Sequence, residues 1–393
     1  MEFSRFESTR FVVGRGSLEH LAELAATRVA IVTDITAMES NGFLRRVQEL
    51  INRAGAVYEV VADVRREPHT SDVAGALERV ARFAPDCIVA LGGGSVIDAA
   101  KALWLFYEHP DTTWEAAFRP FAVPPLGRKA YLVAVPSTSG TGSETTFVAV
   151  LIDHDRRKRL IMSRELVPRL AIIDPDLADT MPPHVAAHAG MDALTHALEA
   201  AVSHLANPMV VATAMSAVQD ILTWLPVSVG GGTRSDERRQ AREAMHAAAS
   251  LAGVAIGSAS AGLAHAMDQP GPLFGIPHGL VCAILLPHTL RFSSPHPVYA
   301  ALARRLGHEG DEGELCNALV RRVWELCRAI GIPRGFRDLG VGQKDFECQL
   351  PGLVEETMKS GSTRLAPVQP DREQARGILI SAYHGRHPLE KGV

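Results

Sequence analysis

A buried strand that runs directly into a glycine turn constrains the fold of this chain more than any other feature. Asp86–Leu91 is apolar after its first residue, and Gly92-Gly93-Gly94-Ser95-Val-Ile-Asp98 follows at once. Glycines let the backbone approach a ligand closely, and the amides at a helix start point at anions. The segment predicts a strand, a phosphate-binding turn and a helix. A purely structural turn, with Ser95 as the helix cap and Asp98 as its capping-box partner, stays open as an alternative.

The first 180 residues alternate between strand-like and helix-like patterns. Leu18–Ala26 and Asp72–Phe83 are helix-like. The expected strands are short runs rich in apolar and β-branched residues: Val29–Thr33, Ala56–Ala62, Cys87–Leu91, Tyr131–Val135 and Phe147–Ile152. Strands that alternate with helices of about a dozen residues predict βαβ units and a parallel sheet.

The pattern changes near residue 180. Beyond it, long Ala- and Leu-rich amphipathic segments dominate, broken at Gly230–Gly232, Pro270–Pro277 and Ser293–Pro297. We therefore expect an α/β dinucleotide-binding domain over residues 1–180 and an all-helical domain over residues 181–393. A chain of 393 residues exceeds one ordinary hydrophobic core, which agrees with two domains.

Composition narrows the class of protein. The formal net charge of −4 argues against a nucleic-acid-binding surface. Five cysteines, odd in number and without Cys-x-x-Cys spacing, indicate reduced thiols in the cytoplasm. Ala247–Ala264 carries no charge, yet its Ala, Gly and Ser content favours one buried helix of a soluble bundle over a membrane span. We expect a cytoplasmic protein with no nucleic-acid or membrane partner.

Four residues of the second half have the chemistry of metal ligands. Asp192 and His196 lie four residues apart in Gly190–Ala200, so they share one helix face. His265 ends the uncharged helix-like segment, and His278 lies in a Pro-Gly turn. One carboxylate with three imidazoles suits Fe(II) or Zn(II) and can leave a position for substrate. Each residue alone is more often an ordinary buried or surface side chain, but the four together predict a metal site.

Polar residues also follow strands in the first half. Asp34 ends the run Val29–Thr33, where a carboxylate can accept both ribose hydroxyls of an adenosine and repel a 2′-phosphate. Pro136–Glu144 is a hydroxyl- and glycine-rich loop that suits phosphate or ribose contacts, or is a plain polar turn. The basic run Arg156–Arg159 is either a solvated turn or the source of one contact to cofactor phosphate.

Together these motifs resemble the iron-containing (metal-dependent, group III) alcohol dehydrogenase family over nearly the whole chain. The resemblance implies an α/β domain for NAD, a helical metal domain and a cleft between them. It implies that the metal ligands are Asp192, His196, His265 and His278. It implies cofactor contacts from Asp34, Gly92, Gly93, Gly94, Ser95, Asp98, Thr138, Ser139, Thr141 and Arg159, the last standing where the family usually has a lysine.

The chain also departs from the family pattern. The family commonly has a second histidine four residues after the first one on the Ala/Gly helix, and Gln269 stands there in this chain. Glutamine cannot titrate, so we expect Gln269 to line the site without relaying a proton. The loop that follows looks one residue short and carries Pro270 and Pro272, which predicts a stiff loop.

The sequence thus predicts an alcohol dehydrogenase or aldehyde reductase that moves a hydride between NAD(H) and a small alcohol or aldehyde. We expect one divalent metal, Fe(II) first, with Zn(II) or Mn(II) as alternatives, and a homodimer or larger homo-oligomer. Two other functions stay open. One is a sugar-phosphate cyclase, a lyase resembling dehydroquinate synthase, which shares the two-domain architecture. The other is a non-catalytic relative that lost turnover when the second histidine became Gln269.

Overall fold

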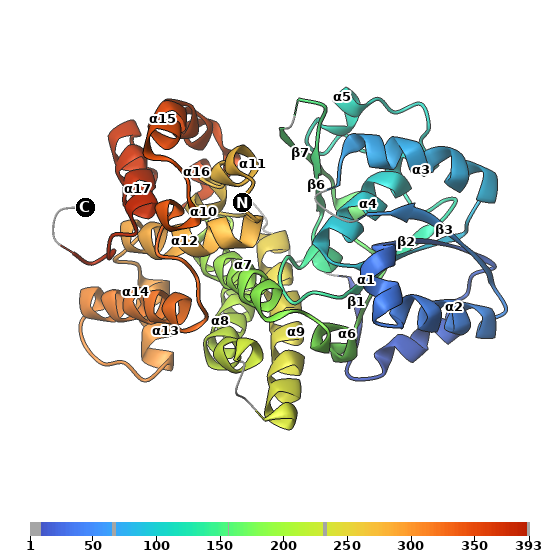
Figure 1. Cartoon of the computed structure of the whole chain (residues 1–393), viewed down its shortest axis with the longest axis horizontal. Coiled ribbons are helices and arrows are strands. Elements are labelled where there is room, and N and C mark those ends of the chain that lie inside the picture. Colours follow the sequence, from blue (N-terminus) through green and yellow to red (C-terminus); the bar gives the residue numbers. More distant parts are fainter. Residues whose placement is uncertain (1–8, 65–67, 156, 231–233, 391–393) are drawn as a thin grey trace. The chain divides into compact units, whose positions relative to one another are not determined.

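The computed structural model of the chain describes residues 9–64, 68–155, 157–230 and 234–390. It forms two compact units, one ending at Met181 and the other beginning at Pro182 (Figure 1). The expected boundary, between residues 180 and 181, lies one residue from this division. Arg156 of the basic run and Gly231–Gly232 of a predicted helix break lie outside the described residues.

The first unit is built on a six-stranded parallel sheet with the strand order β1-β8-β5-β4-β2-β3. The strands are β1 (Arg10–Val13), β2 (Arg28–Thr33), β3 (Val57–Asp63), β4 (Cys87–Gly92), β5 (Tyr131–Pro136) and β8 (Leu170–Ile173). Alternate residues along β2 and β4 belong to two different apolar cores, as the two-residue period of a strand requires. The predicted parallel sheet is confirmed.

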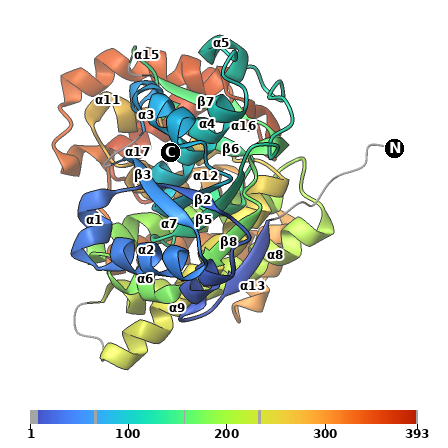
Figure 2. The same ribbon diagram turned by 90° about the vertical axis from the view of Figure 1, so that its right-hand side faces the viewer.

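Helices cover both faces of this sheet. The helices of this unit are η1 (Ser17–Glu23), α1 (Ile35–Ser40), α2 (Phe43–Arg53), α3 (Thr70–Phe83), α4 (Gly94–Glu108), α5 (Trp114–Ala117), η2 (Ser143–Thr145), η3 (Arg164–Leu166) and α6 (Pro175–Asp179). Apolar residues of α2 and η1 pack on one face, and those of α3 and α4 pack on the other. Figure 2 shows α3 and α4 on one side of the strands and α2 on the other. Burial on both faces explains the continuous apolar runs of the central strands.

Two sequence expectations for the first unit were wrong. Phe147–Ile152 yields β6 (Val148–Ile152), which pairs antiparallel with β7 (Lys158–Met162) in a separate two-stranded sheet. The link between β6 and β7 is too short for the crossover that parallel pairing needs, so the pair forms a hairpin. The helix expected over Leu18–Ala26 is the 3₁₀ helix η1.

The second unit is all-helical among its described residues, as predicted. Its helices are α7 (Pro183–Val202), α8 (Pro208–Val229), α9 (Ser235–Ser258), α10 (Leu263–Ala266), α11 (Pro270–Phe274), α12 (His278–Phe292), α13 (Pro297–Arg305), α14 (Glu312–Ala329), η4 (Phe336–Leu339), α15 (Gln343–Lys359), α16 (Gly361–Leu365) and α17 (Arg372–His384). α7 packs against α8, α9 and α12. At Gly190 a Cβ atom would lie 2.3 Å from Cδ1 of Leu225, so glycine lets α8 approach α7 closely.

Two of these helices, α8 and α9, are relevant to whether the chain contains a membrane-spanning helix. Within the described residues, α8 alone is long and apolar enough to cross a membrane by length and composition. Its buried residues, among them Val210, Val218 and Ile221, belong to the core of the helical unit. The single helix expected over Ala247–Ala264 was wrong, because α9 ends at Ser258.

Candidate metal centre and nucleotide-binding loops

The four predicted metal ligands come together in the helical unit. α7 carries Asp192 and His196 one turn apart, α10 carries His265, and α12 begins with His278. Their Nε2 atoms lie 3.7 Å (His196), 3.7 Å (His265) and 3.4 Å (His278) from Oδ1 of Asp192. Donors bonded at about 2.1 Å to one tetrahedral ion lie about 3.4 Å apart. The three distances are close to that value, so each histidine can share a divalent ion with Asp192.

Two of the donor atoms that face each other are buried and lack hydrogen-bond partners. These atoms are Oδ1 of Asp192 and Nε2 of His265, and Asp192 is only 2% exposed. A buried polar atom without a partner costs about 1–3 kcal/mol, and the cost is larger for a charged one. A bound cation satisfies both atoms at once, so these residues fit a metal ion.

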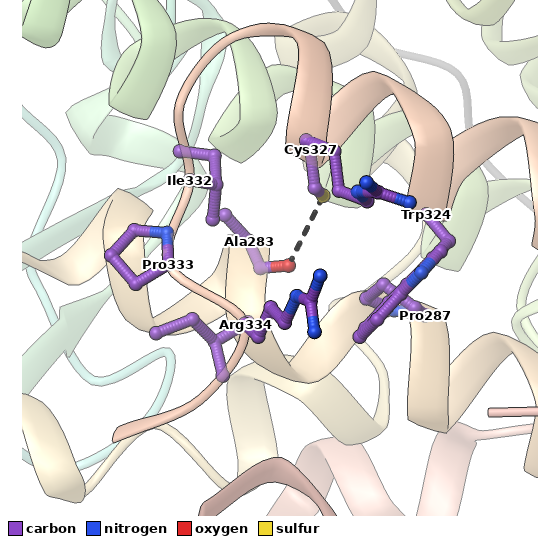
Figure 3. A pocket seen from close by; sticks show the side chains of 9 residues that line it. Ala283, Pro287, Trp324, Cys327, Ile332, Pro333 and Arg334 are labelled. Carbon is purple, nitrogen blue, oxygen red and sulfur yellow. Dashed lines mark hydrogen bonds between the residues drawn. The ribbon is translucent and has the colours of Figure 1, made fainter. Parts of the chain in front are cut away.

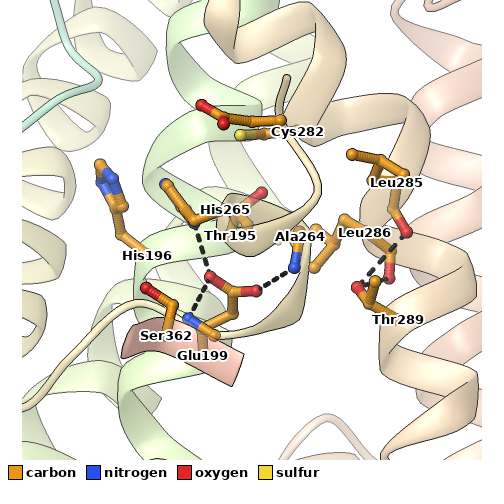
Figure 4. A network of polar contacts seen from close by, with 12 residues as sticks. Thr195, His196, Glu199, Ala264, His265, Cys282, Leu285, Leu286, Thr289 and Ser362 are labelled. Carbon is orange, nitrogen blue, oxygen red and sulfur yellow. Dashed lines mark hydrogen bonds and ion pairs between the residues drawn. The ribbon is translucent and has the colours of Figure 1, made fainter. Parts of the chain in front are cut away.

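Two further carboxylates, which the sequence analysis did not single out, hold the imidazoles from behind. Oε2 of Glu199 lies 2.5 Å from Nδ1 of His265, and Glu199 also accepts the amides of Gly262 and Ala264 at 2.8 and 2.6 Å (Figure 4). Oδ2 of Asp268 lies 3.0 Å from Nδ1 of His278. A carboxylate on Nδ1 keeps the proton there and leaves the lone pair of Nε2 for the ion. The sequence did contain an indication for Glu199, because it lies seven residues after Asp192 and therefore on the same helix face.

These surroundings set the protonation of the site before an ion binds. Burial alone would lower the pKa of His265, but the carboxylates of Glu199 and Asp192 outweigh it and raise that pKa to about 10. Burial lowers the pKa of His196 to about 4, partly offset by Asp192. Burial would raise the pKa of Asp192, yet the neighbouring histidines hold it well below its ordinary value. We therefore expect an incoming ion to release a proton from His265.

The local settings of the ligands differ from expectation. His265 lies on the separate short helix α10, because the chain leaves the helical conformation at Ala259, with φ −126° and ψ −113°. His278 is the first residue of α12 and is not in an open turn. The stiff loop expected after Gln269 is the one-turn helix α11, with Pro270 in its first turn and Gly275 closing it at φ 68°. Gln269 precedes this helix and is half-buried, and its role in lining the site stays a prediction.

In the first unit, the predicted nucleotide residues follow adjacent strands. The chain runs outward from β2 to β3 on one side and continues from β4 to β5 on the other, so the order reverses between β2 and β4. Asp34 comes directly after β2, and Gly93 directly after β4. Ligands of open parallel sheets bind at this reversal, beyond the carboxyl ends of the strands.

The glycine turn and the hydroxyl-rich loop pack against each other. A Cβ atom at Gly94 would lie 2.5 Å from Oγ1 of Thr141, and one at Gly93 would lie 3.3 Å from Thr138. Gly93 is the helix cap and α4 begins at Gly94, so the alternative in which Ser95 caps the helix was wrong. α4 presents its N-terminus at the end of a central strand, which is the geometry of an anion-binding helix start.

Asp98 does not complete a capping box. Its Oδ1 accepts the Ser143 hydroxyl at 2.5 Å, and its Oδ2 accepts the Val150 amide at 3.0 Å. Lys101, one turn further along α4, is fully buried and donates to the carbonyls of Thr146 and Val148, each at 2.8 Å. Burial lowers the pKa of Lys101 to about 8. Asp98 and Lys101 together hold in place the chain that follows the hydroxyl-rich loop. The sequence analysis did not single out Lys101, although a lysine among apolar residues of a helix indicates a buried side chain with a specific partner.

Asp34 and Arg159 already have partners inside the first unit. Oδ1 of Asp34 accepts the Ala37 amide at 3.0 Å and so caps α1. The guanidinium of Arg159 lies 3.7 Å from Oδ2 of Asp153 and 4.8 Å from the ring centre of Phe118. The cofactor contacts expected from Asp34 and Arg159 stay predictions.

A hollow between α12 and α14 is a separate feature of the helical unit (Figure 3). Pro287, Trp324 and Arg334 are among the residues that line it. The Cys327 thiol donates to the carbonyl of Ala283 at 3.6 Å, and burial raises the pKa of Cys327 to about 12. The Cys327 thiol is therefore neutral near neutral pH and offers no thiolate to the hollow.

Comparison with known proteins decides the family. The sequence model of "Iron-containing alcohol dehydrogenase" matches residues 8–175, and that of "Fe-containing alcohol dehydrogenase family, C-terminal" matches residues 186–383. The chain belongs to the iron-containing alcohol dehydrogenase family. The predicted family and fold are confirmed, and so is the predicted reaction class, an NAD(P)-dependent oxidoreductase acting on alcohols. Membership of this family removes the support for a sugar-phosphate cyclase.

Three members illustrate the likeness. The chain is 36% identical over 377 residues to an NADPH-dependent butanol dehydrogenase of Clostridium saccharobutylicum, covering 95% of this chain and 96% of that protein. It is 36% identical over 388 residues to an alcohol dehydrogenase of Thermococcus barophilus, covering 96% and 98%. The solved structure of an iron-containing alcohol dehydrogenase from Thermococcus thioreducens superposes with a TM-score of 0.87 at 34% identity, covering 98% and 100%.

Proposed function

We propose that this protein is a metal-dependent alcohol dehydrogenase and aldehyde reductase that moves a hydride between NAD(H) and a small alcohol or aldehyde. The observation that carries the proposal is the convergence of three imidazole Nε2 atoms on the buried, unpartnered Oδ1 of Asp192. Membership of the iron-containing alcohol dehydrogenase family supports alcohol oxidation and aldehyde reduction as the reaction at this site.

The residues of the helical unit prepare the site for substrate. A divalent ion bound there supplies a Lewis acid, which polarises an aldehyde oxygen or lowers the pKa of an alcohol. Asp192 neutralises part of the cationic charge, and Glu199 and Asp268 fix the rings of His265 and His278. We propose Fe(II) as the resident ion because the family is iron-containing, with Zn(II) and Mn(II) as alternatives, since all three accept nitrogen and oxygen donors.

The residues of the first unit bind the cofactor. Gly92, Gly93, Gly94 and Ser95 form the pyrophosphate turn. Ser139 and the two threonines that pack on that turn, Thr138 and Thr141, contact the cofactor from the second loop, and Asp98 and Arg159 support the site from α4 and β7. Asp34 accepts the adenosine ribose hydroxyls. The butanol dehydrogenase named above is NADPH-dependent by its name, so in this chain the preference for NAD depends on Asp34.

Gln269 takes a part in the site that does not involve a proton. Its amide can orient a substrate hydroxyl or the carboxamide of the nicotinamide, but it cannot exchange a proton near neutral pH. The proposal thus predicts turnover without a titrating group at this position, which distinguishes it from the alternative of a non-catalytic relative. That alternative predicts binding of metal and nucleotide with no hydride transfer.

We further propose that the protein works in the cytoplasm as a homodimer or larger homo-oligomer. β1 lies at an edge of the sheet and exposes Phe11 by 38% and Val13 by 59%. An open strand edge with exposed apolar side chains supports pairing with a second copy. A Val13→Lys variant that runs at the same mass as the unmodified protein in light scattering would count against this edge as the interface.

A panel assay tests the proposed function. Purified protein is loaded anaerobically with Fe(II), and NADH oxidation is followed with a series of aldehydes, NAD⁺ reduction with the matching alcohols. We expect turnover with at least one matching pair of aldehyde and alcohol in the panel. Metal and NADH binding without turnover on any substrate of the panel would favour the non-catalytic alternative.

A further inference from the structure

A cysteine lies beside the metal centre. Cys282 follows His278 by four residues on α12, so both side chains share one helix face. Cys282 is fully buried, and its Sγ lies 3.7 Å from Nε2 of His278. The ligand atoms of Asp192, His265, His278 and Cys282 all lie within 4.8 Å of one another. Figure 4 shows Cys282 in the same view as His196 and His265.

Two overlapping sets of four donors therefore exist at this site. Both contain Asp192, His265 and His278; His196 completes one set with nitrogen, and Cys282 completes the other with sulfur. In a tetrahedral zinc site, a sulfur bonded at about 2.3 Å and a nitrogen at about 2.1 Å lie about 3.6 Å apart. Sγ lies 3.7 Å from Nε2 and 3.9 Å from Nδ1, so the sulfur lies beside the ring of His278, and a rotation of the Cys282 side chain brings it to the ion.

A simple thiol–imidazole hydrogen bond explains this arrangement less well. Sγ lies 3.9 Å from Nδ1 of His278, but that nitrogen is already 3.0 Å from a carboxylate oxygen of Asp268. The thiol would have to donate to Nε2 instead. Nε2 is the atom that lies 3.4 Å from Oδ1 of Asp192, where the ion is expected. Sulfur and ion therefore share one neighbourhood.

We propose that Cys282 is a further ligand of the metal, whose thiolate binds Zn(II) and Co(II) together with Asp192, His265 and His278. This inference rests on the metal site proposed above. The thiol gives its proton to solvent as the sulfur binds the ion, so no oxidant or reductant is needed. Because thiolate is a soft ligand and Mn(II) prefers oxygen, Cys282 biases the site toward Zn(II) and away from Mn(II).

A spectrum of the Co(II)-loaded protein tests this directly. We expect a thiolate-to-Co(II) charge-transfer band in the near ultraviolet for the unmodified protein. The band should vanish in Cys282→Ser and persist in Cys348→Ser, a control at the exposed cysteine of α15. The presence or absence of the band in the unmodified protein already decides the question, so the test does not depend on whether the Cys282→Ser variant folds.

Competition with a chelator gives a second measurement. Cys282→Ser should weaken Zn(II) binding by about tenfold or more and leave Mn(II) binding unchanged. If Co(II) binds the unmodified protein without the charge-transfer band, or if Zn(II) binding is equal in both proteins, Cys282 is no ligand and the four-residue site still stands. If neither ion binds the unmodified protein, this inference and the proposed function fail together.

Discussion

The two units form their sites by different means. In the helical unit, the proposed metal site consists of side-chain donors from α7, α10 and α12, among them two buried atoms without hydrogen-bond partners, Oδ1 of Asp192 and Nε2 of His265. In the α/β unit, the proposed nucleotide site consists of backbone at the ends of β2 and β4, and a Cβ atom at Gly93 or Gly94 would meet the threonines of the second loop. The first depends on the identity of a few functional groups, and the second on how closely two loops approach. The same small substitution should therefore have different consequences in the two units.

Removal of one donor should have the largest effect. Asp192→Ala deletes the carboxylate around which the three imidazoles gather, so we expect loss of bound metal and a fall in turnover of about 1,000-fold or more. Circular dichroism should show an intact fold, because the helical core does not depend on this contact. Metal analysis and NADH oxidation give the two readouts. Retained metal in this variant would contradict the assignment of Asp192.

Addition of one methyl group to the glycine turn should have the next largest effect. In Gly94→Ala the new Cβ would lie 2.5 Å from Oγ1 of Thr141, which forces the two loops apart. A displacement of this kind costs about 100-fold in kcat/KM for the cofactor, and metal content should not change. Gly75→Ala, on α3 with open space around it, is the matched control and should leave both values unaltered. Equal behaviour of the two variants would remove the distinction between the units.

A carboxylate that touches the metal only through another residue should have a smaller effect. Glu199→Gln should weaken metal binding by about 10- to 100-fold, because His265 loses the group that holds its ring. The amides of Gly262 and Ala264 use different oxygens of Glu199, and glutamine keeps only one acceptor oxygen, so one of the two amides loses its partner. Circular dichroism checks that the fold is retained. A metal affinity equal to that of the unmodified protein would show that Glu199 is only a structural residue.

The pH dependence of metal binding separates these roles further. The raised pKa of His265, about 10, means that the metal-free site holds a proton below that pH and releases it when the ion binds. Metal affinity should therefore rise by about tenfold per pH unit between about pH 7 and pH 9. In Glu199→Gln the pKa of His265 falls toward its ordinary value, so the rise should level off at lower pH. Isothermal titration at several pH values measures both curves, and a flat curve for the unmodified protein would contradict the protonated state.

Much of this comparison was accessible from the sequence, but the parts that depend on distant contacts were not. The spacing of Asp192 and His196 predicts a shared helix face by itself. The position of His265 depends on α10, whose amides are held by Glu199 across 63 and 65 residues of chain, and no local pattern indicates that contact. Asp268, the carboxylate behind His278, lies between α10 and α11, ten residues before that histidine in the chain.

The same holds for the sheet. The central strands are predictable from the sequence, because strands that are buried on both faces are continuous apolar runs. β1 and β8 are only four residues long, and they pair with each other although most of the first unit separates them in the sequence. The local sequence pattern therefore does not predict either strand. Phe147–Ile152 has strand composition, but composition cannot tell a hairpin from a strand of the main sheet.

Asp34→Gly should show the smallest effect on activity, since it alters the preference between cofactors and otherwise removes only the side-chain cap of α1. Removal of the carboxylate takes away a like charge that would lie against a 2′-phosphate. We expect kcat/KM to shift toward NADP(H) by about tenfold with metal content unchanged. The comparison is made with both cofactors on one preparation of each protein. A higher kcat/KM with NADPH than with NADH in the unmodified enzyme would overturn the role of Asp34.

The central claim is that the buried Asp192 and its three histidines hold the ion on which hydride transfer depends. It is tested most directly by one experiment on the unmodified enzyme: NADH oxidation with an aldehyde substrate, before chelation, after exhaustive chelation, and after return of Fe(II) or Zn(II). The account predicts that turnover disappears with the metal and returns in proportion to the ion bound per chain. Undiminished turnover by metal-free protein would contradict it.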